Sequence, residues 1–187
     1  MARSTIVAVA VALGAVGCGS AVQRAPVMPE GGPVTIALFV DPGVAPAMTE
    51  EQVSQRGQLS EYMRPHLIEV LGEAGYATEL LASQTDYRPG PGRYLLLVRI
   101  TAYDPGSAAA RVLVGMGAGA CAIDTDYFLY GMGQNPLYSG RQSRGSGRSW
   151  EALVERVDLD TVNDVTAAFG SLPPEPAPNA SAGAATP

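Results

Sequence analysis

The sequence predicts an α+β fold in which a mostly antiparallel sheet is covered on one face by two helices. Three observations lead to this fold class: an apolar run typical of a buried strand, two long stretches with apolar residues at helical spacing, and alternating stretches between them. The order strand, long helix, strands, helix is typical of helices gathered on one face of a sheet. Residues 34–170 have the size of a single globular domain.

The first strand and the first helix have well-marked ends. Val34 to Val40 is apolar throughout, and the turn sequence Asp41-Pro42-Gly43 follows it. Thr49 and Gln52 have the spacing of a capping box, which starts a helix. The apolar stripe of that helix ends before Gly75, a typical C-terminal stop. We therefore expect a buried central strand followed by one long helix.

The middle of the chain is expected to be a series of strands. Tyr76 to Leu81 is a candidate for a short strand. In Arg93 to Tyr103, every second side chain is apolar, so a strand there would have one apolar face. Cys121 to Tyr130 alternates in the same way, and Leu137 to Gln142 follows a hairpin-like connection. The last three stretches should form an antiparallel meander.

The end of the chain divides into a helix and a tail. Ser149 can cap a helix in which apolar residues recur at helical spacing up to Phe169, and Gly170 ends it. Residues 171–187 are rich in Pro, Ala and Ser and lack the side chains for a core, so we expect them to be disordered.

The charge balance excludes nucleic acid as a partner. The 12 basic residues, all arginine, face 18 acidic residues, for a formal net charge of −6. Nucleic-acid-binding domains carry the opposite sign on their binding surface. The sequence also contains no spacing typical of a catalytic or metal-binding set, so we expect a non-enzymatic protein without a metal or cofactor.

The N-terminus is typical of an exported protein. Met1 to Gly17 combines a basic start with an apolar run, which predicts a signal peptide that is too short to span a membrane. The stretch Leu13-Gly14-Ala15-Val16-Gly17-Cys18 resembles a bacterial lipobox, which implies that Cys18 is lipidated and becomes the new N-terminus. A plain signal peptide with an incidental cysteine is the alternative.

A lipidated Cys18 would anchor the protein to a membrane through its acyl chains, each buried methylene being worth about 0.8 kcal/mol. Gly19 follows the cysteine, which resembles the outer-membrane address of Gram-negative lipoproteins. We expect the protein on the periplasmic face of the outer membrane. Residues 18–33, rich in Pro and Gly, should form a flexible tether.

A glycine-rich stretch follows the turn sequence Asp104-Pro105-Gly106-Ser107. Gly115 to Gly119 superficially fits a dinucleotide loop, but a phosphate loop opens a helix, and the residues that follow alternate like a strand. We therefore expect these glycines to allow a bulge or close backbone packing.

The Gly-Ser, Arg and Gly-x-Gly-Ala-Gly pattern is carried by Gly106-Ser107, Arg111 and Gly115 to Gly119. With a strand on each side, in an exported lipoprotein, it resembles the bacterial family catalogued as domain of unknown function 4410. The resemblance covers roughly Val34 to Phe169 and implies no catalytic residue.

Four arginines are candidates for an interaction surface. Arg141, Arg144 and Arg148 lie in a Gly/Ser-rich segment and could contact phosphate or carboxylate groups of the envelope, although a flexible basic loop explains them equally well. Arg111 is the one charge beyond Asp104 in the stretch that resembles the family.

Other polar residues have simpler expected roles. Asp124 and Asp126 share a strand face about 7 Å apart, a spacing compatible with acid–base work but commoner among solvated acids. His66, the only histidine, should face solvent with Glu69. Cys121 should be a buried free thiol, since Cys18 would be lipidated. The acidic residues of the last helix should form its solvent-exposed face; they are Glu151, Glu155, Asp158, Asp160 and Asp164.

The function expected from these features is that of a lipid-anchored envelope domain that binds another envelope protein or helps to assemble a complex. Two alternatives stay open: a module that binds an anionic envelope component through Arg141, Arg144 and Arg148, and a hydrolase that uses Asp124 and Asp126.

Overall fold

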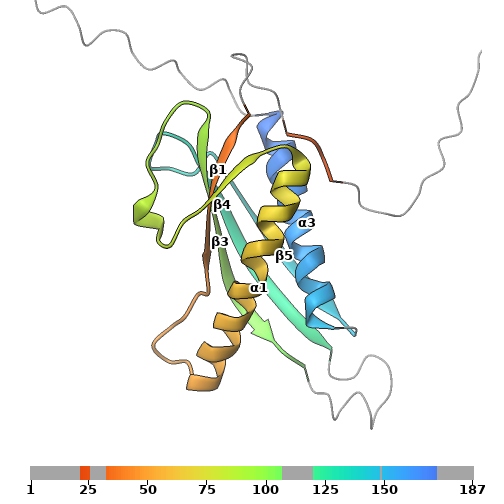
Figure 1. Cartoon of the computed structure of the whole chain (residues 1–187). Coiled ribbons are helices and arrows are strands. Elements are labelled where there is room, and N and C mark those ends of the chain that lie inside the picture. Colours follow the sequence, from red (N-terminus) through yellow and green to blue (C-terminus); the bar gives the residue numbers. More distant parts are fainter. Residues whose placement is uncertain (1–21, 26–32, 107–119, 148, 172–187) are drawn as a thin grey trace, which may run out of the picture.

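A computed structural model describes residues 22–25, 33–106, 120–147 and 149–171. Five strands form one sheet, and two α-helices and a short 3₁₀ helix complete the fold (Figure 1). The strands are β1 (Thr35–Asp41), β2 (Ala77–Leu80), β3 (Arg93–Asp104), β4 (Cys121–Tyr130) and β5 (Tyr138–Ser146). The helices are α1 (Glu50–Ala74), η1 (Gln84–Asp86) and α3 (Trp150–Phe169).

The sheet has the strand order β2-β1-β3-β4-β5. The long pairings of β3 with β4 and of β4 with β5 are antiparallel, which confirms the predicted meander. Strand β1 pairs in parallel with both β2 and β3, so the chain crosses over between these strands. The expected α+β class is confirmed, with a mostly antiparallel sheet and two α-helices on one face.

The predicted ends of α1 are confirmed in detail. The Thr49 side chain accepts from the Gln52 backbone N–H at 3.2 Å, and the Gln52 side chain accepts from the Thr49 N–H at 3.0 Å. Gly75 ends the helix in the left-handed conformation, with φ of 99°. These local signals lie close together in the sequence, which is why they predict the boundaries so well.

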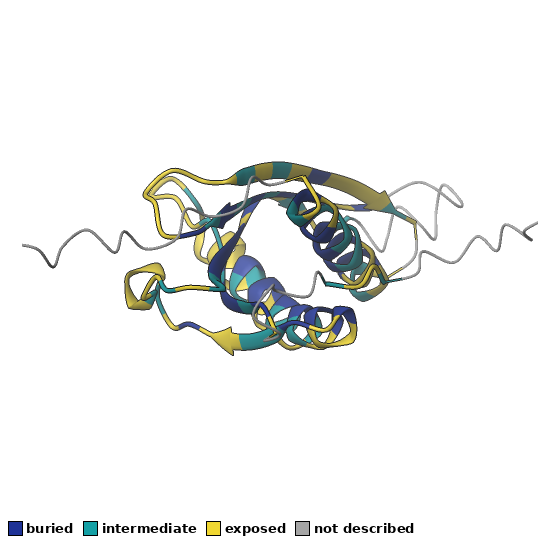
Figure 2. Ribbon diagram, turned by 90° about the horizontal axis from the view of Figure 1, so that it is seen from above, coloured by how far each residue is buried: buried dark blue, intermediate teal, exposed yellow. Residues whose placement is uncertain are grey.

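The main core lies between the two α-helices and the face of the sheet that they cover. Seen from above, the buried sides of both helices face inward and their exposed sides face out (Figure 2). The largest fully buried side chains include Tyr127, Ile36, Leu38, Met63, Leu67 and Leu96. Cys121 is buried and is not in a disulfide, as expected.

The other side of the sheet carries no α-helix among the described residues, and we call it the open face. Part of it is covered by the connection between β2 and β3, whose Leu81 packs with Ala37 and Leu95 in a second, smaller apolar cluster. Phe39 and Tyr130 lie at the edge of that cluster.

A buried arginine joins the N-terminal half of α1 to the sheet. Arg56 is 8% exposed, and its guanidinium donates to the carbonyl oxygens of Gly43 at 3.1 Å, Ile100 at 2.6 Å and Thr101 at 2.9 Å. The register of β3 against β4 shifts beside Thr101, between Ile100 and Ala102. Arg56 therefore hydrogen-bonds carbonyl groups at and beside this irregularity of the ladder, where regular pairing is interrupted.

Part of the predicted tether lies against the domain. The backbone N–H of Gln23 donates to Asn163 Oδ1 at 2.8 Å, and that of Ala25 donates to the carbonyl of Ala74 at 2.7 Å. Ala74 is the last residue of α1, so residues 22–25 lie at the end of the domain where α1 and α3 finish. No helix among the described residues is long and apolar enough to cross a membrane.

Candidate functional site

Two of the four arginines predicted as an interaction surface, Arg141 and Arg144, lie on opposite faces of the sheet. Both lie on β5, three residues apart, so their side chains point in opposite directions. Arg141 binds Asp126 on β4, whereas Arg144 reaches Asp160 on α3 at 2.9 Å. Arg111 and Arg148 lie outside the described residues, as does Cys18.

The two carboxylates predicted as an acid–base candidate each have a partner on β5. Asp124 accepts a hydrogen bond from the Ser143 hydroxyl at 2.6 Å. Asp126 accepts from Arg141 at two positions, Nε to Oδ1 at 2.6 Å and Nη2 to Oδ2 at 3.2 Å. A bidentate pair of this kind orients the carboxylate along the sheet. Asp124 and Asp126 thus serve cross-strand pairing.

The open face carries a row of alternating charges across four strands, which we call the charge row. Asp41 on β1 lies opposite Arg99 on β3, Arg99 lies opposite Asp126 on β4, and Asp126 lies opposite Arg141 on β5. Arg99 Nε donates to Asp41 Oδ2 at 2.7 Å, so the row consists of two ion pairs side by side. Its two arginines are 46% and 67% exposed, and solvent therefore reaches it.

An apolar row lies next to the charge row, one pleat closer to the start of β1. Phe39, Leu97 and Phe128 occupy successive strands in register, and Ser139 completes the row on β5. Leu97 is buried between the two half-buried phenylalanines. Beyond this row, a hollow of about 650 Å³ is lined mainly by the β2–β3 connection and the β4–β5 turn. Exposed Met132 contributes to its wall.

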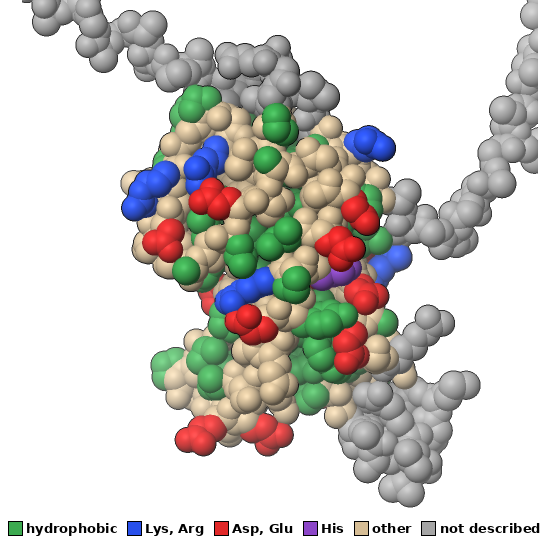
Figure 3. Space-filling view, viewed as in Figure 1, with side chains coloured by type: hydrophobic (Ala, Val, Ile, Leu, Met, Phe, Trp, Pro, Cys, Tyr) green, Lys and Arg blue, Asp and Glu red, His purple; other side chains and the backbone are tan. Residues whose placement is uncertain are grey.

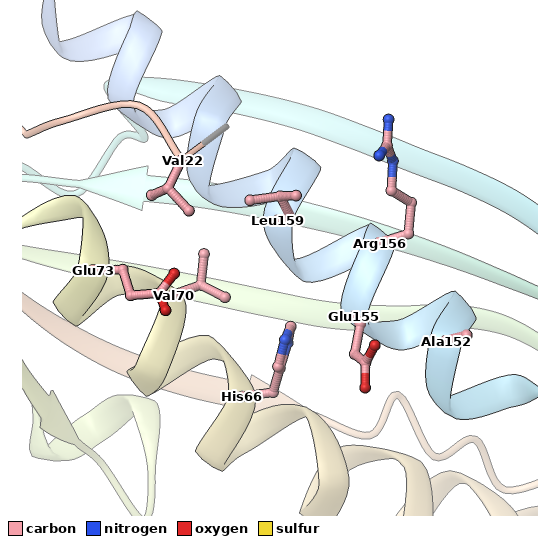
Figure 4. Close-up of a pocket in the computed structure, with 8 residues that line it drawn as sticks. All are labelled: Val22, His66, Val70, Glu73, Ala152, Glu155, Arg156 and Leu159. Carbon is pink, nitrogen blue, oxygen red and sulfur yellow. The ribbon is translucent and has the colours of Figure 1, made fainter. Parts of the chain in front are cut away.

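On the helix side, a second candidate site lies between α1 and α3. Val22, His66, Glu73, Glu155 and Leu159 are among the side chains that border a hollow of about 390 Å³. Their side chains extend from α1, α3 and the N-terminal segment toward the same space (Figure 4). In Figure 3, where the single histidine is purple, acidic side chains lie close to it, above and to its right.

His66 joins the two helices at the base of this hollow. Its Nδ1 lies 2.9 Å from Oδ2 of Asp158, whose side chain is fully buried. Burial raises the pKa of Asp158 to about 7, and the hydrogen bond to His66 opposes this rise. The hydrogen bond to Asp158 raises the pKa of His66, against the effect of its burial. Asp158 Oδ1 has no hydrogen-bond partner among the described residues, which adds to the cost of its charge.

Two expectations about these residues are wrong. His66 does not simply face solvent, because its imidazole is bound to a buried carboxylate from α3. The acids of α3 do not all form a wet face: Asp158 is buried, and Asp164 accepts from Tyr127 at 2.6 Å and from Gln142 at 2.7 Å. Glu155, in contrast, is exposed as expected.

The sequence does contain a signal for these buried charges. Asp158 continues the apolar stripe of α3, and Arg56 continues that of α1 by one turn. A charged residue at such a position has to find a partner in the core. Within the described residues, no group of three or more histidine, cysteine or acidic side chains is arranged to hold a metal ion.

Comparison with known proteins gives a family and several distant structural neighbours. A variant of PelC from Paraburkholderia phytofirmans, a dodecamer, is 11% identical with a TM-score of 0.46, covering 77% of this chain and 93% of that one. Protein XCC0632 from Xanthomonas campestris is 12% identical with a TM-score of 0.45, and the match covers 80% of this chain and 94% of that one. A minor lipoprotein from Acinetobacter baumannii is 12% identical with a TM-score of 0.32, and the match covers 75% of this chain and 96% of that one.

No curated protein matches the sequence. The family model described as Domain of unknown function (DUF4410) matches residues 34–157, from the start of β1 into α3. This match covers most of the globular domain and includes the whole sheet. The chain belongs to the family Domain of unknown function (DUF4410).

Proposed function

We propose that the protein is a lipid-anchored interaction domain of the bacterial cell envelope, which binds or assembles with another envelope protein and carries out no chemistry itself. The observation that supports it most is the open face, where a charge row and an apolar row lie side by side across four strands. Protein interfaces combine an apolar centre with charged and polar surroundings in this way.

The anchor in this proposal is Cys18, and its support comes from the lipobox-like sequence before it. The described part of the chain begins at Val22, four residues later, and Gln23 is bound to α3. Since an extended chain spans at most about 3.6 Å per residue, the domain would lie within about 20 Å of the acyl chains. The protein would therefore act close to the periplasmic face of the outer membrane.

Replacing the anchor residue tests the attachment directly. Cys18→Ser is expected to move the protein from the membrane fraction to the soluble fraction and to abolish its labelling by fatty acid, because a serine hydroxyl does not replace the lipidated sulfur. Fractionation of cells followed by immunoblotting measures both forms. Ser20→Ala, two residues away, is the control and should remain in the membrane. A Cys18→Ser protein that stays in the membrane would rule out this anchor.

Site-specific photocrosslinking tests the interaction surface. A photoreactive residue in place of Ser139, on the open face, is expected to give an adduct with a protein of the envelope. The same residue in place of exposed Glu61 on α1 is the control for the helix side. The proposal fails for this face if the Ser139 position gives no adduct, or if both positions give the same products.

A further inference from the structure

The charge row has the order needed to bind a reversed copy of itself. From β1 to β5 it reads Asp41, Arg99, Asp126, Arg141, which is acid, base, acid, base. Reversed, it reads base, acid, base, acid. A second row laid face to face in the reversed direction therefore sets an arginine opposite every aspartate.

We propose that two copies of this chain associate through their open faces about a two-fold axis parallel to the strands. This inference rests on the proposed function, and it identifies the partner in that function as a second copy of the chain. The axis passes between β3 and β4, so Asp41 faces the second copy's Arg141, and Arg99 faces the second copy's Asp126. Each contact occurs twice, as in every isologous interface. A two-fold axis perpendicular to the strands within the interface would instead set equal charges against one another.

The same axis also matches the apolar rows. A rotation about the strand direction leaves each row at its own height, so the apolar row of one copy meets the apolar row of the other. Leu97 on β3 then faces Phe128 on β4, and Phe39 on β1 faces Ser139 on β5. The β2–β3 connection covers the next row, that of Ala37 and Leu95, and it stands at the same height in both copies. The two sheets would therefore lie closest at their charge rows, and further apart at their apolar rows than the roughly 10 Å that separates packed sheets.

The positions of the membrane anchors agree with this axis. Residues 22–25 lie at the end of the domain where α1 and α3 finish. A two-fold axis along the strands leaves both copies with that end pointing in the same direction. Two domains anchored through Cys18 in one membrane leaflet could therefore pair without either tether having to reach around the dimer.

The interface is small, so anchoring would be part of its mechanism. Four strands about 4.8 Å apart and two rows about 7 Å apart give about 270 Å² of flat area per copy, well below the standard size of about 800 Å². We therefore expect weak association in solution. Confinement of both copies to one membrane raises their effective concentration and favours pairing.

Two paired charge exchanges test the proposal without breaking an ion pair within the chain. Variant one carries Asp41→Arg with Arg99→Asp, and variant two carries Asp126→Arg with Arg141→Asp. Each variant keeps opposite charges within the exchanged pair, but in its own dimer every facing pair would have equal charges. Between variant one and variant two, every facing pair is opposite again. We expect each variant alone to associate at least about tenfold more weakly than the unchanged chain, and their mixture to recover the unchanged affinity.

The measurement is sedimentation equilibrium of the full chain carrying Cys18→Ser, so that acyl chains do not drive association, at concentrations up to about 1 mM. Glu61→Arg with Arg64→Glu exchanges an ion pair on α1 and is the matched control, with no expected effect on association. Circular dichroism checks that each variant is folded.

The outcomes separate this inference from the proposed function. An unchanged chain that stays monomeric at about 1 mM overturns the dimer. A dimer that the exchanges do not weaken, or a mixture of the two variants that does not recover association, overturns this interface. A photocrosslink from Ser139 to a different envelope protein, with the chain itself monomeric, overturns the dimer and leaves the proposed function in place.

Discussion

Gly43→Ala is expected to lower the free energy of unfolding by about 2–5 kcal/mol, the sum of a backbone clash and a left-handed conformation. Gly43 has φ of 63°, and a Cβ atom there would lie 1.9 Å from the Ile100 carbonyl oxygen. That oxygen also accepts the 2.6 Å hydrogen bond from Arg56, so moving β3 away would break a buried contact. Urea denaturation followed by circular dichroism measures the change.

Gly72→Ala is the matched control for this substitution. Gly72 lies inside α1, and a Cβ atom there would meet nothing within 4 Å. Alanine loses less conformational freedom than glycine on forming a helix, so this variant should be more stable by about 0.5–1 kcal/mol. If Gly43→Ala were as stable as the unchanged protein, the close approach of the β1–α1 turn to β3 would be wrong.

The His66–Asp158 pair is expected to make the protein less stable as the pH rises from 5 to 8, by about 1–2 kcal/mol. The folded-state pKa of Asp158 is about 7, above its ordinary value of 3.8, and that of His66 is also raised, from 6.5. The folded state therefore binds more protons than the unfolded chain. The contribution of the pair is full at low pH and is lost as the pH rises through these raised pKa values.

Asp158→Asn should remove most of this pH dependence. An amide has nearly the shape of the carboxyl group and can still hydrogen-bond His66 Nδ1, but it carries no charge that burial would penalise. Urea midpoints at pH 5, 6, 7 and 8 measure the slope for both proteins. Glu155 and Glu69 also raise the pKa of His66, so a small slope should persist in the variant.

Glu73→Gln provides the control for the loss of an acid near the same hollow. Glu73 borders the hollow between α1 and α3, but it is not among the groups that shift the pKa of His66 or Asp158. Its variant should keep the slope of the unchanged protein. A slope that survives Asp158→Asn undiminished would show that another group is responsible.

The candidate site was predictable only in part. Alternation along β4 correctly placed Asp124 and Asp126 on one face of the sheet, because side-chain direction in a strand follows from sequence position. The partners of those side chains depend on register between strands, which alternation alone does not determine. Arg141 therefore looked like a free cation in the sequence, whereas in the fold it binds Asp126.

For the buried charges, too, the sequence shows which residues are buried but not which groups they contact. Arg56 and Asp158 both fall on the apolar stripes of their helices, a local pattern that is visible in the sequence. The group that each one meets is far away in the chain: Ile100 is 44 residues from Arg56, and His66 is 92 residues from Asp158. Such partners become known only once the helices are packed on the sheet.

By itself, the sequence determined the α+β class, the capped ends of α1, the limits of β4 and the antiparallel meander, because all of these depend on residues close together in the chain. Only the tertiary structure decided that β1 lies in parallel between β2 and β3. That placement aligns Asp41 with Arg99 and so completes the charge row across four strands. The physical reason is that strand order and register are set by packing between distant segments, and the open face exists only once those segments meet.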